Sequence, residues 1–152
     1  MKHLLILILL LPTLSSAGDV ETKYFSLTLP DNFHVETDKS SRLLAFGGNS
    51  PRDLPFLSIE FGPRVTEQFS DILLRINQSL SGSGKSLEKI DCKGNCEAHY
   101  VEATQEMNEQ SLTQIHYAVK SDKISFIISY GTQNNSEKQF VLNIGEQILN
   151  GI

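Results

Sequence analysis

The segment Ile124-Ser125-Phe126-Ile127-Ile128-Ser129-Tyr130 decides how the chain folds. Its residues Ile127 and Ile128 are adjacent, and adjacent side chains of a β-strand point to opposite faces of the sheet. A strand that is apolar on both faces is covered on both sides. We therefore expect this segment to lie in the centre of a β-sheet.

Several strands precede this segment in the chain, and their apolar residues alternate with polar ones. In one of them Leu57, Ile59 and Phe61 alternate with Ser58 and Glu60, the pattern of a strand that buries one face. Predicted strands occupy residues 25–29, 34–36, 42–46, 57–61, 87–92, 96–104 and 112–119. Short turns join neighbouring strands, which favours antiparallel pairing.

Two segments have the spacing of amphipathic helices. The first begins after Thr66, a predicted N-cap, and its apolar residues fall on one helical face: Phe69, Ile72, Leu73, Ile76 and Leu80. The second begins with the capping-box sequence Ser136-Glu137-Lys138-Gln139 and ends at Asn150-Gly151. The order of strands, helix, strands and helix predicts an α+β fold. We expect an antiparallel β-sheet with the two helices covering one of its faces, not a doubly wound parallel sheet.

The stretch Tyr24-Phe25-Ser26-Leu27-Thr28-Leu29-Pro30-Asp31-Asn32-Phe33-His34-Val35 resembles the opening of PsbP-like and DcrB-like domains. Those domains begin with an alternating strand, a proline turn and a second strand that carries an aromatic residue. The order of the later elements is also similar over most of the chain. The resemblance implies a sandwich with an antiparallel sheet between helices, an exported or membrane-associated accessory role, and no shared catalytic residues.

The first residues have the composition of a secretory signal. Lys2 is followed by an apolar run from Leu4 to Leu11, and Ser15-Ser16-Ala17 supplies the small residues that signal peptidase accepts. The run is shorter than the roughly 20 residues of a membrane-spanning helix. We expect residues 1–17 to be a signal peptide and residues 18–152 to form one exported domain. The bacterial periplasm is the favoured compartment, and secretion is the alternative.

The charge of the chain argues against two kinds of partner. It has 13 Lys and Arg against 18 Asp and Glu, a formal net charge of −5, and no basic cluster along the sequence. Such a chain is not suited to nucleic acid or to an anionic membrane surface, and no segment after the signal is long and apolar enough to span a membrane. A periplasmic protein is the expected partner, while its identity and the oligomeric state stay open.

Both cysteines, Cys92 and Cys96, lie in the segment Ile90-Asp91-Cys92-Lys93-Gly94-Asn95-Cys96. Thioredoxin-like redox chemistry uses Cys-x-x-Cys at the start of a helix, whereas these residues have a longer spacing and lie between strands. A structural zinc site needs four ligands, and two free thiols would suit a reducing compartment. The favoured interpretation is a disulfide across a tight hairpin in an exported protein, with Lys93-Gly94-Asn95 as its turn.

Two histidines form a second candidate site. If the strands 96–104 and 112–119 pair around a turn near Asn108-Glu109, Val101 lies opposite His116. His99 and His116 then lie diagonally on one face of the sheet, which we expect to be its solvent face. The two histidines are either a surface transition-metal site or, in the favoured interpretation, two solvated side chains, and a slip of one residue would separate them.

No catalytic arrangement is recognisable in the sequence. The carboxylates are scattered, and no serine lies in a Gly-x-Ser-x-Gly elbow. Gly82-Ser83-Gly84-Lys85-Ser86 lacks the first glycine of a phosphate-binding loop and follows a predicted helix instead of a strand. We therefore expect neither enzymatic activity nor a cofactor.

Three classes of function remain, and an exported accessory or protein-binding domain ranks first. A periplasmic immunity protein that blocks a toxin is a special case of it. The second class is a small-ligand carrier with a pocket between sheet and helix, lined by Phe33, Phe46, Phe56 and Phe61. An enzyme with an unrecognised site ranks third.

Loops that a rigid sheet holds in place are the expected position for a binding site. Two loops are rich in turn-forming residues, and they supply these candidates: Gly47, Gly48, Asn49 and Arg52 in the first, and Lys93 and Asn95 in the cysteine loop.

Overall fold

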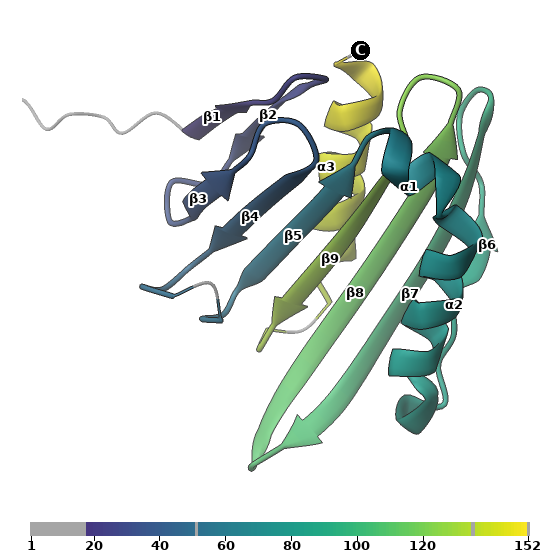
Figure 1. Ribbon diagram of the computed structural model, residues 1–152. Coiled ribbons are helices and arrows are strands. Elements are labelled where there is room, and N and C mark those ends of the chain that lie inside the picture. Colours follow the sequence, from purple (N-terminus) through teal and green to yellow (C-terminus); the bar gives the residue numbers. More distant parts are fainter. Residues whose placement is uncertain (1–17, 51, 135, 152) are drawn as a thin grey trace, which may run out of the picture.

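The computed structural model describes residues 18–50, 52–134 and 136–151. The predicted signal peptide, residues 1–17, lies outside the described residues. An antiparallel sheet of seven strands forms the body of the molecule, with helices on both of its sides (Figure 1). The α+β class predicted from the sequence is confirmed. In the described part of the chain, no helix is long and apolar enough to cross a membrane.

The strands of the sheet are β3 (His34–Thr37), β4 (Arg42–Phe46), β5 (Phe56–Phe61), β6 (Glu88–Ile90), β7 (Cys96–Met107), β8 (Gln110–Ser121) and β9 (Phe126–Thr132). Their order across the sheet is β3-β4-β5-β9-β8-β7-β6, and each pair of neighbours is antiparallel. Two further strands, β1 (Gly18–Glu21) and β2 (Ser26–Leu29), form a separate hairpin. The helices are α1 (Pro63–Glu67), α2 (Phe69–Ser79) and α3 (Lys138–Asn150), with the short 3₁₀ turn η1 (Ser81–Ser83) after α2.

Strand β9 is the middle strand of the seven, as the sequence predicted. It pairs with β5 on one side and with β8 on the other. Ile127 and Ile128 are both buried, with exposed fractions of 5% and 0%, although they point to opposite faces. Apolar side chains therefore cover both faces of the sheet at its centre.

The larger core lies between the sheet and α3. Val141, Ile144 and Ile148 of α3 belong to the same buried cluster as Ile128 of β9. The hairpin of β1 and β2 extends this cover, because Leu27 and Leu29 of β2 are buried in that cluster. Strand β1 was not predicted, since only Val20 among its four residues is buried.

The smaller core lies on the opposite face, under α1 and α2. Phe69, Ile72 and Ile76 of α2 form a buried cluster with Ala118 of β8 and Ile127 of β9. The prediction that both helices cover one face is therefore wrong: α2 and α3 lie on opposite sides of the sheet (Figure 1). Helical periodicity identifies the apolar side of each helix, but it contains no information about which sheet face that side meets.

Helix α2 covers only one half of its sheet face. The sheet residues that join its cluster come from β7, β8 and β9: Val101, Ala103, Ala118 and Ile127. Strands β4 and β5 contribute none of them. The half of this face that lies over β4, β5 and the neighbouring part of β9 is left without a helix, and this open half holds the candidate site.

Both predicted N-caps differ from the observed helix starts. Thr66 lies inside α1, and its hydroxyl donates a hydrogen bond of 2.8 Å to Ser125 in place of capping a helix. Ser136 donates to the Glu102 carboxylate at 2.9 Å, while Glu137 occupies the N-cap position of α3 without a side-chain bond to it. In both cases a partner elsewhere in the fold holds the hydroxyl that the local pattern assigned to a cap.

The disulfide predicted between Cys92 and Cys96 is present. It closes the connection between β6 and β7, which pair in the antiparallel hairpin expected from the sequence. Gly94, at the tip, has a φ of 95°, in the region that glycine enters without strain. The disulfide thus fixes the hairpin at one edge of the sheet.

Replacement of Ile128 by alanine should lower the free energy of unfolding by about 3 kcal/mol, because it leaves a cavity at the centre of the larger core. Chemical denaturation monitored by circular dichroism measures this loss. Leu74→Ala on α2, where the leucine is 56% exposed, is the matched control and should cost far less. A similar loss in both variants would contradict the central position of β9.

Replacement of both cysteines by serine should lower the free energy of unfolding by about 2 kcal/mol, the value expected for a closed loop this short. Denaturation of the oxidised protein and of the double variant gives the difference. Because the disulfide lies at the edge of the sheet, the variant should still fold in one cooperative transition. A variant that lost β7 and β8 as well would show that the disulfide has a wider role.

Candidate functional site: an arginine-lined groove

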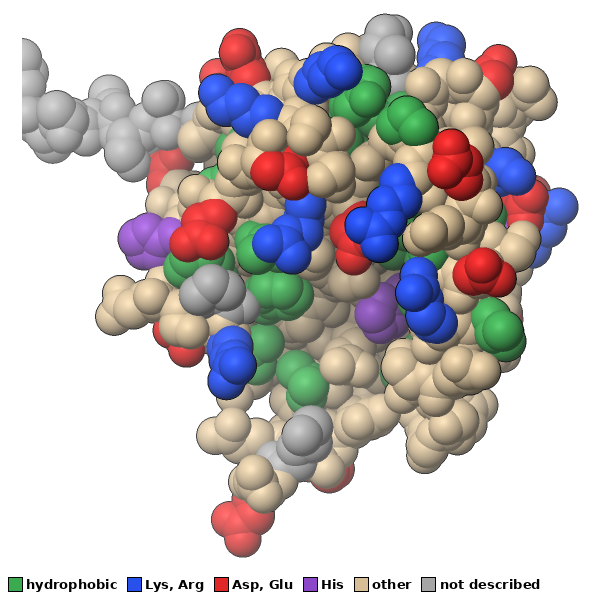
Figure 2. Space-filling model, in the orientation of Figure 1, with side chains coloured by type: hydrophobic (Ala, Val, Ile, Leu, Met, Phe, Trp, Pro, Cys, Tyr) green, Lys and Arg blue, Asp and Glu red, His purple; other side chains and the backbone are tan. Residues whose placement is uncertain are grey.

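The open half of the sheet is hollowed into a groove, here called the arginine groove. It consists of three adjoining hollows of about 420, 380 and 350 Å³. Ser129 lines the first and the third, while Glu60 and Arg64 line both the second and the third. Figure 2 shows this face, with basic side chains standing around the hollowed surface. The shared residues make the three hollows one continuous feature.

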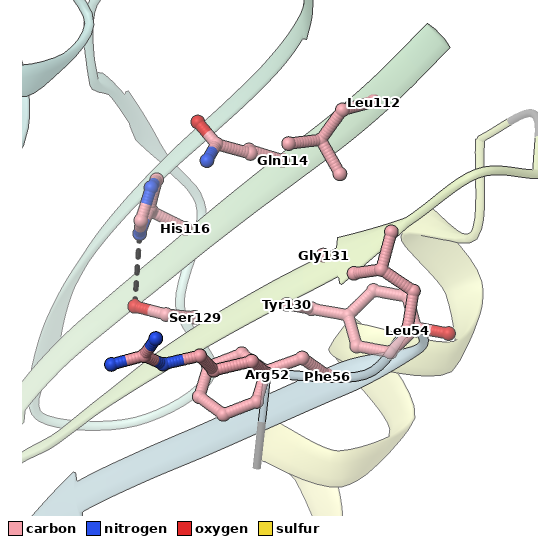
Figure 3. A pocket seen from close by; sticks show the side chains of 9 residues that line it. All are labelled: Arg52, Leu54, Phe56, Leu112, Gln114, His116, Ser129, Tyr130 and Gly131. Atoms are coloured by element: carbon pink, nitrogen blue, oxygen red, sulfur yellow. Dashed lines mark hydrogen bonds between the residues drawn. The ribbon is translucent and has the colours of Figure 1, made fainter. Parts of the chain in front are cut away.

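The first hollow is the apolar end of the arginine groove (Figure 3). Leu54, Phe56 and Leu112 line it, together with the backbone of Gly131 on β9. A Cβ atom at position 131 would lie 3.4 Å from Leu54 Cδ2 and 3.9 Å from Leu112 Cδ1. The hollow therefore exists partly because residue 131 has no side chain.

The loop between β4 and β5 forms the rim at this apolar end. The Asp53 carboxylate accepts hydrogen bonds from the backbone N–H groups of Asn49 and Ser50, at 2.8 and 2.9 Å. Gly48 lies so close to Asp53 that a side chain there would displace the carboxylate. The loop is thus closed on itself, and it presents Arg52 to the groove.

All four arginines of the chain line the arginine groove: Arg42, Arg52, Arg64 and Arg75. They come from β4, the β4–β5 loop, α1 and α2, so no local sequence pattern links them. None of the described lysines lines any of the three hollows. Within the described part of the chain, no carboxylate forms an ion pair with any of the four guanidinium groups. The sequence has no basic cluster, whereas the fold creates one.

His116 and Ser129 form a hydrogen-bonded pair on the floor of the groove. The distance between His116 Nδ1 and Ser129 Oγ is 2.9 Å (Figure 3). Burial lowers the pKa of His116 from its ordinary value of 6.5, so the imidazole is neutral at pH 7. Among the described residues no carboxylate bonds to the imidazole, so the pair lacks the orienting acid of a catalytic triad.

The predicted register of the two histidine strands is confirmed. Val101 lies opposite His116, and His99 and His116 point to the same face of the sheet. The prediction that this is the solvent face holds for one half of it only, because α1 and α2 pack on the other half. His99 Nε2 lies 2.7 Å from Glu97 Oε1, and its ring packs beside Phe69.

Each histidine is thus held by a different neighbour. The hydrogen bond from His99 lowers the pKa of the Glu97 carboxyl. Within the described residues, no group of three or more His, Cys, Asp or Glu side chains is arranged to hold a metal ion.

The structure separates the other predicted binding residues. Arg52 reaches the groove, while Gly47, Gly48 and Asn49 shape the loop behind it. Lys93 and Asn95 lie at the exposed disulfide hairpin, and neither lines the groove.

The four phenylalanines predicted to line one pocket are also separated. Phe56 and Phe61 line the groove. Phe33 stacks on Phe140 of α3, on the other side of the sheet. Phe46 is buried and lies beside His34.

Comparison with known proteins gives information about the fold alone. No family model matches the chain, and no curated protein matches it. Solved structures with a similar fold include a crystal structure of a protein from Bacteroides thetaiotaomicron VPI-5482, with a TM-score of 0.53 and 11% sequence identity. The similarity covers 82% of this chain and 44% of that protein. The chain therefore spans less than half the length of the structure that it matches.

The protein should lose stability below pH 6.5, and His116 should account for part of this loss. Because burial lowers the pKa of His116, the unfolded chain binds a proton where the folded chain does not. The contribution of His116 to the free energy of unfolding is fully present above pH 6.5, and it is lost as the pH falls below that value. Urea denaturation at pH 7.5 and at pH 5 measures the difference.

The variant His116→Gln should reduce this pH dependence. His34→Gln, which replaces an exposed histidine, is the matched control and should leave it unchanged. An equal pH dependence in the wild type and in His116→Gln would contradict the assignment.

Proposed function

We propose that this protein is an exported, non-enzymatic accessory domain that binds a partner protein in the arginine groove. The observation that carries the proposal is the position of the four arginines, which gather on one open sheet face without a carboxylate partner among the described residues. Asp38 and Glu60 line the same hollows, but neither forms an ion pair with a guanidinium group, and the four arginines outnumber them. The groove therefore keeps an excess of positive charge that the described chain does not neutralise. A ligand or a partner with negative charge supplies the missing counterpart.

Two further considerations support a role without catalysis. The only histidine in the groove is neutral and bonds to a serine, and no described acid orients it. The proposed signal peptide and the proposed relation to PsbP-like and DcrB-like domains both agree with an accessory role, since members of that family are mostly exported or membrane-associated. The sheet between helices is consistent with that relation. The periplasm is the proposed compartment, in which an immunity protein would be one form of the same binding function.

A small-ligand carrier is the second candidate, because of the apolar hollow near Gly131. Its volume of about 420 Å³ falls within the range of ligand pockets. Ligand pockets bury most of the ligand, however, and this hollow opens onto the surface as part of a longer groove (Figure 2). The open shape and the distributed charge favour a protein partner over an enclosed small molecule.

Affinity purification from the native envelope fraction tests the proposal. The wild-type protein should retain one partner in a stoichiometric amount, identified by mass spectrometry. The triple variant Arg42→Gln, Arg64→Gln and Arg75→Gln should lose it, because it removes three of the four groove charges.

The matched control is Lys85→Gln, Lys89→Gln and Lys123→Gln, which removes the same charge outside the groove and should retain the partner. A partner that binds both variants equally, or no partner after mild crosslinking, would contradict binding through the groove.

A further inference from the structure

The two ends of the arginine groove differ in chemistry. The first hollow is mostly apolar, with Leu54, Phe56 and Leu112 in its lining, and its one charged side chain is Arg52 of the rim loop. The second and third contain Arg42, Arg64 and Arg75 together with two carboxylates, Asp38 and Glu60. The Asp38 carboxylate is already occupied, because it accepts hydrogen bonds from the Ser41 hydroxyl and from the backbone N–H groups of Ser40, Ser41 and Arg42. A ligand that fits the whole groove therefore has an apolar part at one end and negative charge at the other.

The groove follows the direction of the strands. Arg42 and Phe46 are the first and last residues of β4, and they pair with Glu60, the last residue but one of β5, and with Phe56, its first residue. The charged hollow contains Glu60, and the apolar hollow contains Phe56. A strand of this length spans roughly 20 Å. A single small anion occupies only a fraction of that distance, whereas an extended peptide of about six residues covers it.

The choice of arginine over lysine indicates the charged group that is bound. The guanidinium group is planar and forms paired hydrogen bonds with a carboxylate, which the ammonium group of lysine does not. The chain keeps its described lysines out of the groove and places every arginine in it. Carboxylates spaced along an extended chain match this arrangement, since Arg64 lines two of the hollows and Arg42 and Arg75 each line one of them.

We propose that the arginine groove binds an extended acidic segment of the partner protein, with an apolar side chain in the hollow at Gly131 and carboxylates over Arg42, Arg64 and Arg75. This inference rests on the proposed function and adds the chemistry of the bound segment. Asp38 and Glu60 lie among the arginines and set the spacing, because the carboxylates of the segment avoid them. The neutral His116 and Ser129 lie between the two ends and add no charge.

Fluorescence anisotropy with designed peptides tests the inference. The first probe is a labelled peptide of sequence leucine-serine-aspartate-serine-aspartate-glutamate, and the second has the reverse order, because the direction of the bound chain is open. At least one of them should bind to the purified protein and dissociate as salt is added. Its amide counterpart has asparagine and glutamine in place of the acids, and its affinity should be lower by roughly tenfold or more.

A double-mutant cycle locates each part of the peptide. In Arg42→Gln/Arg75→Gln, the acidic probe should bind no better than its amide counterpart. In Gly131→Val, whose side chain fills the apolar hollow, replacing the leucine of the probe by alanine should no longer weaken binding. Lys85→Gln/Lys89→Gln removes the same charge elsewhere and should bind the acidic probe like the wild type. Thermal denaturation of each variant verifies that it is folded.

Four results would overturn the inference. One is equal binding of the acidic and amide peptides. Another is binding that the Arg42→Gln/Arg75→Gln variant retains. The third is arginine-dependent binding of laurate without binding of either acidic peptide, which would favour a small-ligand carrier. If neither peptide binds although the arginine triple variant loses the purified partner, the groove recognises a folded surface: the proposed function then stands and this inference fails.

Discussion

Ile127 and Ile128 are neighbours in β9, and one packs under α2 while the other packs toward α3. This burial on both sides fixes most of the architecture. It places β9 in the centre of the sheet, and it requires an apolar cover on each face. Helix α3 and the hairpin of β1 and β2 supply one cover, and α1 and α2 supply the other.

The two covers differ in width, and the groove results from that difference. A helix is about 10 Å across with its side chains, while neighbouring strands lie about 4.8 Å apart, so one helix covers two or three strands. The sheet has seven strands. On the face of α3, the hairpin of β1 and β2 covers part of the remainder. On the face of α2 the further helix among the described residues is α1, which has only five residues, and the floor of the groove is what remains uncovered.

The sequence predicts local features well and the spatial grouping poorly. The central position of β9 follows from two adjacent isoleucines, the disulfide from the hairpin around Gly94, and the register of β7 and β8 from the turn near Asn108. Each of these depends on residues close together in the chain.

The side of the sheet that each helix covers depends on long-range packing, as do the partners of Thr66 and Ser136. The arginine groove also depends on long-range packing: Arg42 and Arg75 are 33 positions apart, and they line adjoining hollows only because β4 and α2 flank the same open face. Arg42 and Glu60 are polar residues at alternating positions of two predicted strands, but the sequence does not show that they share a face. That becomes clear only from the pairing of β4 with β5, in which Arg42 lies opposite Glu60.

The four groove arginines have no ion pair with a described carboxylate, and each of them is exposed. The residues that hold the fold together are a different set, concentrated in the two apolar clusters. Substitutions of these four arginines are therefore expected to leave the scaffold intact. In evolutionary terms, these four positions are free to diverge at little cost to folding, and relatives with the same backbone need share none of the four arginines.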